Sequence, residues 1–178
     1  NQLDILCDKT GINTKNIIEA CNTKWNFNFY KPGLVGGHCI SVDPYYLIDY
    51  AKAHKFNFSS LELSRNINDS YINFIRNKIQ KFFTKKLLKS NDQILFIGGT
   101  YKKDIGDIRN SGALKIFKFF KKKYPKTILY DPLLKKNNIK NLDRFKAIII
   151  LVLHTQVKNN KKLISYLKNN NKVINISH

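Results

Sequence analysis

The sequence predicts an α/β protein in which a helical N-terminal part leads through one long helix into a doubly wound parallel sheet. Apolar residues recur every three or four positions over 59–88, which is the period of one amphipathic helix. After residue 90, short apolar runs alternate with helical segments, the pattern of a parallel sheet covered by helices. Before residue 59, helical pieces are joined by an irregular loop.

Two short helices and a shaped loop are expected first. Gly11 stands where the glycine after a helix C-terminus is expected, and residues 14–22 carry apolar side chains at helical spacing. Residues 25–42 are rich in aromatic residues, asparagine and glycine and follow neither the helical nor the strand period. They are therefore expected to form a shaped loop.

Two further helices follow this loop. Asp43 with Pro44 is typical of a helix start, with Asp as N-cap and Pro at the first helical position, and this helix should run to about His54. Ser59 and Glu62 form a capping-box pattern at the start of the long helix. A helix of this length is expected to bridge two domains or to pack in a dimer seam. Its apolar residues are Leu63, Ile67, Tyr71, Phe74, Ile75, Ile79, Phe82 and Leu87.

The C-terminal part is expected to be a parallel, doubly wound sheet. Strands are expected at 93–97, 127–130, 147–153 and 172–176, with helices at 111–123 and 161–169. In such sheets ligands bind beyond the carboxyl ends of the strands, so the connection 98–110 is the expected binding loop. Asp131 follows the second strand and could accept from a ribose hydroxyl or form an Asp-Pro turn.

The composition indicates a globular chain with material for a core, since 43% of the 178 residues are hydrophobic and 12% are aromatic. The longest apolar run, 147–153, is much shorter than the about 18 residues of a membrane span, and no signal-peptide pattern opens the chain. Cys7, Cys21 and Cys39 form no CxxC pair, which fits a reducing compartment. A cytoplasmic location is expected, with no membrane partner and no metal site.

The formal charge of +20 raises the question of nucleic-acid binding. Lysines are scattered among asparagines on every segment, as at 121–123, 135–138 and 159–162, and build no single basic face. This pattern favours a solvated surface, so no nucleic-acid partner is expected. The excess should still attract phosphate-bearing small molecules.

The loop from Tyr30 to Tyr46 carries the strongest local chemical signal. Gly36 and Gly37 would let the backbone approach a ligand, and Cys39 just ahead of a helix N-terminus lies in a field that favours thiolate. These residues describe a nucleophile on a tight loop. On the residues alone, a small buried cysteine beside a simple turn is an equally acceptable interpretation.

The loop 98–111 carries the second signal. Lys102 and Arg109 precede a helix capped by Ser111, a setting that suits a diphosphate. Because the loop contains neither a GxGxxG nor a P-loop pattern, a solvated loop remains the alternative.

Taken together, the two motifs resemble the UDP-glucose/GDP-mannose dehydrogenase family, nearest its UDP-N-acetylhexosamine branch. The resemblance covers nearly the whole chain and rests on four segments: 24–39, 42–47, 100–102 and 107–111. It implies a helical central dimerisation domain with the catalytic cysteine loop at 1–58, a connecting helix at 59–89 and a Rossmann-like UDP-sugar-binding domain at 90–178. A homodimer through the central domain and the long helix is expected.

The resemblance also implies a reaction, the NAD-dependent oxidation of a UDP-sugar's C6 alcohol to a carboxylate. Cys39 would capture the aldehyde as a thiohemiacetal and later carry a thioester, and Asp43 would orient and activate the hydrolytic water. The implied ligand-binding residues are Tyr30, Gly36, Gly37 and Lys102 for the substrate and Arg109 for the phosphates of NAD.

Some features depart from the family pattern. The NAD-binding domain and two further catalytic residues would precede Asn1, so the chain is expected to be a fragment that does not turn over alone. Ser41 and Gly99 replace a glycine or proline and a leucine, and His154 is expected to make structural hydrogen bonds. The alternative function is a non-catalytic nucleotide-sugar-binding and dimerisation fragment.

Overall fold

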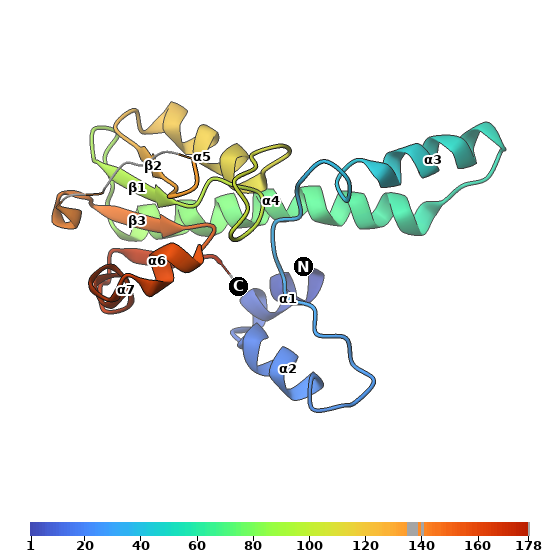
Figure 1. Cartoon of the computed structure of the whole chain (residues 1–178), viewed down its shortest axis with the longest axis horizontal. Helices are drawn as coiled ribbons and strands as arrows, with labels where there is room; N and C mark the ends of the chain where they lie inside the picture. The colour runs from blue at the N-terminus through green and yellow to red at the C-terminus, as the bar shows by residue number, and fades with distance from the viewer. Residues whose placement is uncertain (135–138, 140, 178) are drawn as a thin grey trace.

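The computed structural model describes residues 1–134, 139 and 141–177, so the lysine and asparagine run at 135–138 lies outside the described residues. It confirms the predicted order of helical part, long helix and parallel sheet (Figure 1). The helices are α1 (Gln2–Thr10), α2 (Thr14–Cys21), α3 (Asp43–Ala53), α4 (Ser59–Lys85), α5 (Gly112–Lys123), the 3₁₀ turn η1 (Leu142–Arg144), α6 (Thr155–Asn159) and α7 (Lys161–Lys168). The strands are β1 (Ile94–Ile97), β2 (Ile128–Tyr130), β3 (Ala147–Ile150) and β4 (Val173–Asn175).

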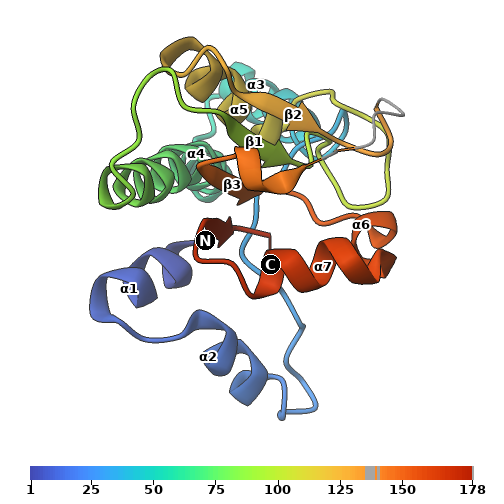
Figure 2. The same cartoon turned by 90° about the vertical axis from the view of Figure 1, so that its left-hand side faces the viewer.

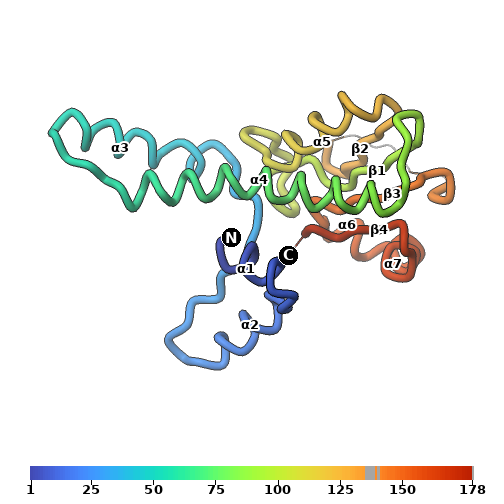
Figure 3. The backbone as a smooth tube through the Cα atoms, turned by 180° about the vertical axis from the view of Figure 1, so that it is seen from behind, coloured from blue at the N-terminus to red at the C-terminus, as the bar shows by residue number. Residues whose placement is uncertain are grey.

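Helix α4 connects the two ends of the molecule (Figure 1). Its C-terminal half packs against the sheet, while its N-terminal half extends beyond the sheet and pairs with α3 to form an arm (Figures 1 and 3). Helices α1 and α2 form a separate pair beside the middle of α4, and the connection from α2 to α3 passes α4 between the arm and the sheet. Within the described part of the chain, no helix is long and apolar enough to cross a membrane.

The sheet has the order β2-β1-β3-β4, and all its neighbouring strands are parallel, as predicted. Alternate residues of each strand face opposite sides, so β1 contributes Ile94 and Phe96 to one core and Leu95 and Ile97 to the other. Helices α4 and α5 cover the first face, and α6 and α7 cover the second (Figure 2). The central strands β1 and β3 are buried throughout, which is why both are continuous apolar runs.

The apolar stripe of α4 is narrower than the sequence indicates. Tyr71, Ile75, Ile79 and Phe83 follow one another at four-residue intervals and are at most 1% exposed. Burial of each such side chain contributes about 1.5–3 kcal/mol to stability. Two residues expected in the stripe, Leu63 and Leu87, are instead 57% and 84% exposed, because one lies on the arm and the other beyond the helix end.

Two helix ends carry the capping residues that the sequence predicts, Gly11 and Ser111, and a third is capped by Asn13, which was not predicted. Gly11 ends α1 in the left-handed region at φ 74°, and Asn13 caps α2 by accepting from the amides of Lys15 and Asn16. The Ser111 hydroxyl caps α5 by accepting from the amide of Leu114 at 3.0 Å.

Two predicted caps are wrong. Val42, not Asp43, is the N-cap of α3, because residues 39–42 already form a turn whose Cys39 carbonyl accepts from the amides of Val42 and Asp43 at 2.8 Å each. Helix α4 is preceded by Phe58, so Ser59 is its first residue and makes no capping box. Its supposed partner Glu62 forms an ion pair with Lys52 at 2.7 Å.

Strand β3 ends at Ile150, three residues before the predicted boundary. The amides of Leu151 and Val152 both donate to the Ile97 carbonyl, at 2.9 and 3.3 Å, which turns the chain out of the sheet. Gly98 permits this turn, since its φ is 85° and an added Cβ would lie 2.2 Å from the Val152 carbonyl oxygen. The residues released from the strand lead into α6, a helix that the sequence did not predict.

Candidate active site

The cysteine loop is held in place by side chains from distant parts of the chain. The Asn1 amide group bonds both backbone groups of Gly33, donating to its carbonyl at 3.1 Å and accepting from its N–H at 2.9 Å. The buried Asn68 of α4 donates to the Val35 carbonyl at 3.3 Å. These bonds hold the loop in place beside α4 just before Gly36 and Gly37.

The two motifs identified in the sequence lie against each other. The Gly37 amide donates to the Arg109 carbonyl at 3.0 Å. The Asn110 side-chain amide donates back to the Gly37 carbonyl at 3.0 Å and to the Ser41 hydroxyl at 3.1 Å. The cysteine loop and the loop after β1 therefore form one unit, although more than seventy residues separate them in the sequence.

Gly36 and Gly37 make this close approach possible. A Cβ on Gly36 would lie 2.6 Å from the Asn110 carbonyl oxygen, and one on Gly37 would lie 2.9 Å from the Tyr101 ring. Gly37 also has a φ of 93°, in the left-handed region that favours glycine. In this structure the crowding that requires glycine thus comes from the second loop.

The Cys39 side chain is exposed, whereas Cys7 is buried and Cys21 is partly buried. The buried-hydrophobe interpretation of Cys39 is therefore wrong. Asp43, the first residue of α3, is exposed one helical turn further along. A solvent-accessible sulfur beside a helix start is compatible with attack on a bound ligand.

Arg109 forms an ion pair with the carboxylate of Asp107. Its Nε and Nη2 donate to the Asp107 oxygens at 2.9 and 2.6 Å, and the side chain is 61% exposed. These hydrogen bonds from Arg109 hold the pKa of Asp107 at about 2. The pKa of Arg109 is raised, mainly by Asp107 and to a smaller extent by the negative charges that Tyr101 and Cys39 can carry.

A cavity of about 430 Å³ opens at the carboxyl ends of β1, β3 and β4, between the cysteine loop and the sheet. Its size lies within the range of small-molecule sites. Basic side chains reach it from three segments: Lys31 from the cysteine loop, Lys102 and Lys103 from the loop after β1, and Lys158 from α6. Several positive charges around one cavity suit a phosphorylated ligand.

Of the predicted ligand-binding residues, Lys102 lines this cavity. Tyr30, Gly36, Gly37 and Arg109 do not line it. Tyr30 is 74% exposed and directly precedes the lining residue Lys31. Gly36, Gly37 and Arg109 belong to the adjoining contact between the two loops.

The lining residues that the sequence did not assign to a site include Lys31, Lys103, Lys158 and Ser177. Lys31 and Lys103 stand next to predicted residues, so their position in the two motifs was a usable signal. Lys158 and Ser177 carry no local signal, because only the parallel sheet brings their segments to the same edge.

Asp131 forms the turn, and the ribose interpretation is not supported. The side chain is 3% exposed and accepts from the amides of Gly99, Thr100 and Leu133 at 2.7, 3.2 and 2.9 Å. Burial alone would raise the pKa of Asp131, but hydrogen bonds from His154, Gly99 and Leu133 outweigh it and lower the pKa to about 2. His154 is fully buried and hydrogen-bonded, as predicted. Among the described residues, no cluster of three or more His, Cys, Asp or Glu could hold a metal ion.

The chain is similar to named proteins in sequence and in fold. The chain is 31% identical over 170 residues to UDP-N-acetyl-D-glucosamine 6-dehydrogenase of Salmonella typhi, covering 89% of this chain and 40% of that protein. It is 33% identical over 172 residues to UDP-N-acetyl-D-mannosamine dehydrogenase of Campylobacter jejuni, covering 88% and 41%. The structure of UDP-D-ManNAc dehydrogenase from Pyrococcus horikoshii superimposes with a TM-score of 0.79 at 28% identity, covering 98% of this chain and 41% of that one.

The chain thus spans about 40% of the length of these relatives. Two family models match it in order: the central domain of the UDP-glucose/GDP-mannose dehydrogenase family at residues 1–70, and the UDP binding domain of that family at residues 95–176. The protein therefore belongs to the UDP-glucose/GDP-mannose dehydrogenase family, and this chain carries the family's central and UDP-binding domains.

Proposed function

We propose that the chain is the C-terminal part of an NAD-dependent UDP-sugar 6-dehydrogenase that oxidises a UDP-N-acetylhexosamine to the corresponding uronic acid. The observation that carries this proposal is the exposed Cys39 on a loop bound to the Arg109 segment, beside a cavity lined by four lysines. The names of the two curated relatives support the N-acetylhexosamine branch.

The cavity is where we place the nucleotide. Lys31, Lys102, Lys103 and Lys158 offer ammonium groups to a diphosphate, and Tyr101 offers an aromatic ring. A UDP-sugar anchored there would extend its hexose along the cysteine loop. Such anchoring by the non-reacting part of a substrate provides the binding energy that orients the reacting carbon.

Cys39 then acts on the sugar. After the C6 alcohol has lost a hydride and a proton, the Cys39 thiolate adds to the aldehyde carbon and forms a thiohemiacetal. Loss of a second hydride from carbon and of the proton from the hydroxyl gives a thioester on Cys39. Water, oriented by Asp43, attacks the thioester carbonyl, and cleavage of the C–S bond releases the carboxylate and regenerates the thiol.

NAD supplies the chemistry of hydride acceptance, twice per turnover, and is bound mainly by a domain outside this chain. The residue here that fits a role towards its phosphates is Arg109. Asp107 engages its Nε and Nη2, and the 61% exposed guanidinium has further N–H groups to offer.

The test is Cys39→Ser in the protein that carries this chain together with an NAD-binding domain. We expect loss of uronic acid formation from UDP-N-acetylglucosamine and UDP-N-acetylmannosamine, measured by chromatography of the product. Cys21→Ser, a partly buried cysteine on α2, is the matched control and should retain the wild-type rate. Acid production by Cys39→Ser at the wild-type rate would exclude the proposed role, and activity on UDP-glucose alone would exclude the branch.

A further inference from the structure

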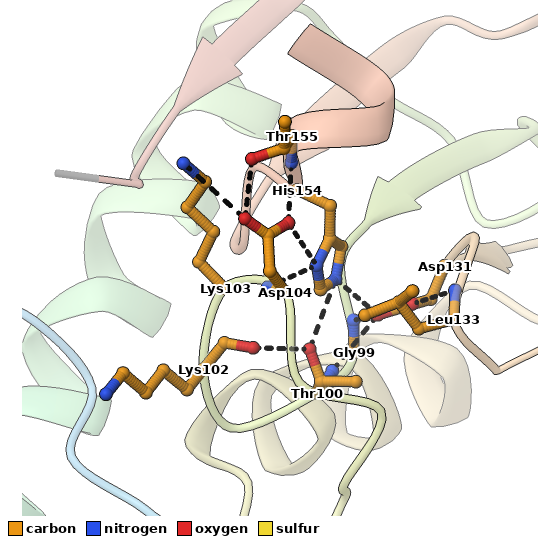
Figure 4. Close-up of polar contacts among 9 residues, drawn as sticks. All are labelled: Gly99, Thr100, Lys102, Lys103, Asp104, Asp131, Leu133, His154 and Thr155. Atoms are coloured by element: carbon orange, nitrogen blue, oxygen red, sulfur yellow. Dashed lines mark hydrogen bonds and ion pairs between the residues drawn. The ribbon is translucent and has the colours of Figure 1, made fainter. Parts of the chain in front are cut away.

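Behind the cavity, a fully buried histidine joins two elements that line it (Figure 4). His154 follows directly on Leu151–Leu153, which line the cavity, and directly precedes α6. Its Nδ1 accepts from the Asp104 amide at 2.9 Å, so the proton of the neutral ring lies on Nε2. Nε2 is 3.0 Å from Asp131 Oδ2 and donates to it. The ring is therefore held in one tautomer and one orientation.

Asp104 connects the loop after β1 to the start of α6. Its carboxylate accepts from the Thr155 amide at 2.7 Å and from the Thr155 hydroxyl at 2.5 Å, at the start of α6. These hydrogen bonds from Thr155 lower the pKa of Asp104. The backbone of Asp104 is in the left-handed region at φ 59°, which aspartate adopts more readily than most residues other than glycine. The bonds to His154 and Thr155 hold Asp104 in this conformation.

Thr100 and Lys102, which precede Asp104 in the loop, are also linked to His154. The Thr100 hydroxyl donates to the Lys102 carbonyl at 3.1 Å, and its Oγ1 lies 3.2 Å from His154 Nε2. Lys102 itself points away from the cluster, towards the light-blue connection between α2 and α3 (Figure 4). A buried polar network thus supports an exposed loop whose lysines reach the cavity.

We propose that His154 and Asp104 form a clamp that positions Lys102 and Lys103 relative to Lys158 of α6, and so sets the spacing of the ammonium groups that hold a diphosphate. The inference rests on the proposed function, because it names the device that pre-organises the nucleotide cavity. Lys102, Lys103 and Lys158 repel each other and have flexible side chains, so without a fixed backbone their ammonium groups would separate. Both residues are positioning residues, since they act through the loop.

The experiment compares two substitutions of His154 in the full chain. His154→Asn places a carbonyl oxygen near the Nδ1 position and can still accept from the Asp104 amide, whereas His154→Gln places a donor near the Nε2 position and loses that acceptor. We measure the dissociation constants of UDP and uridine by calorimetry and amide exchange of Lys103, Asp104 and Thr155 by NMR. Leu167→Ala, in the core between α7 and the sheet, controls for lost stability.

We expect His154→Gln to raise the dissociation constant of UDP about tenfold and that of uridine less than about twofold, because the phosphates are what the lysines hold. In the absence of ligand, the Asp104 amide should exchange faster in His154→Gln than in the wild-type chain. His154→Asn should stay within about threefold of wild type for UDP, and Thr155→Val should lie between the two variants. Leu167→Ala should leave both affinities unchanged.

Equal loss of UDP and uridine affinity in both His154 variants would indicate a merely structural histidine and overturn the clamp. Wild-type affinity and Asp104 protection in His154→Gln would overturn it as well. A wild-type chain that binds neither UDP nor uridine would instead refute the proposed nucleotide cavity. Exchange at Asp104 and Lys103 would then decide separately whether His154 holds the loop.

Discussion

Gly37 is under two separate constraints, one on its backbone and one on its surroundings. Its φ of 93° is strained for any side chain, and the Tyr101 ring occupies the space that a Cβ would need. The neighbouring Gly33 lies on the same loop with nothing within 4 Å of its added Cβ and no positive φ. The glycines of this loop are therefore not equivalent, although they look alike in the sequence.

We predict that Gly37→Ala lowers the free energy of unfolding by about 1–3 kcal/mol, since it combines left-handed strain with a steric clash. Gly33→Ala should change it by less than about 0.5 kcal/mol. Urea denaturation of the two variants provides the measurement. Equal stabilities would mean that the contact between the cysteine loop and Tyr101 is absent in solution.

At the scale of elements, the end of α4 shows a helix terminated without the usual glycine. The Leu88 amide donates to the Phe83 carbonyl at 3.2 Å and the Leu87 amide to the Thr84 carbonyl at 3.0 Å, which is the Schellman pattern. Leu87 occupies the left-handed position with φ 52° and is 84% exposed. Leu87 therefore has the strain of a left-handed backbone, and its side chain gains no stabilisation from burial.

We predict that Leu87→Gly stabilises the chain by about 0.5–1 kcal/mol, because relief of left-handed strain outweighs the extra entropy of glycine in the unfolded state. Leu87→Ala keeps the Cβ and should be neutral within about 0.5 kcal/mol. Thermal unfolding monitored by circular dichroism at 222 nm distinguishes them. A Leu87→Gly variant less stable than Leu87→Ala would contradict the assigned geometry.

At the scale of the whole molecule, the arm formed by α3 and the start of α4 extends away from the sheet (Figure 1). Much of its apolar surface is exposed. Its most exposed large side chains are Tyr46 at 71%, Tyr50 at 64%, Phe56 at 59% and Leu63 at 57%, and Ile40 in the turn before α3 is 71% exposed. Apolar surface gathered on one extended element is typical of an interaction site. We propose that a second copy of the chain covers it.

The prediction is that the chain is a dimer at micromolar concentration and that the double variant Tyr46→Asp, Tyr50→Asp is a monomer. The two tyrosines are one turn apart on α3, and a buried carboxylate at each would be strongly unfavourable. Light scattering after size-exclusion chromatography gives the mass. Leu87→Asp, at the opposite end of α4, should remain dimeric, and a monomeric wild-type chain would refute the proposal.

Local signals in the sequence were sufficient for most of the fold. Helix ends at Gly11 and Ser111 and the alternation of strands and helices after residue 90 were predicted, because each depends on residues close together in the chain. The false caps at Asp43 and Ser59 had the right residue types, but the preceding backbone entered each helix one residue earlier. Boundaries depend on that backbone, which residue type alone does not specify.

The sequence by itself determined the architecture, the nucleophile candidate Cys39 and the two motifs that surround it. Only the tertiary structure decided that Lys31, Lys102 and Lys158 share one cavity and that Asp131 belongs to a buried network with His154. The physical reason is that a cavity at the edge of a parallel sheet is assembled from strand ends far apart in the chain. No pattern within one segment encodes which distant side chains will meet there.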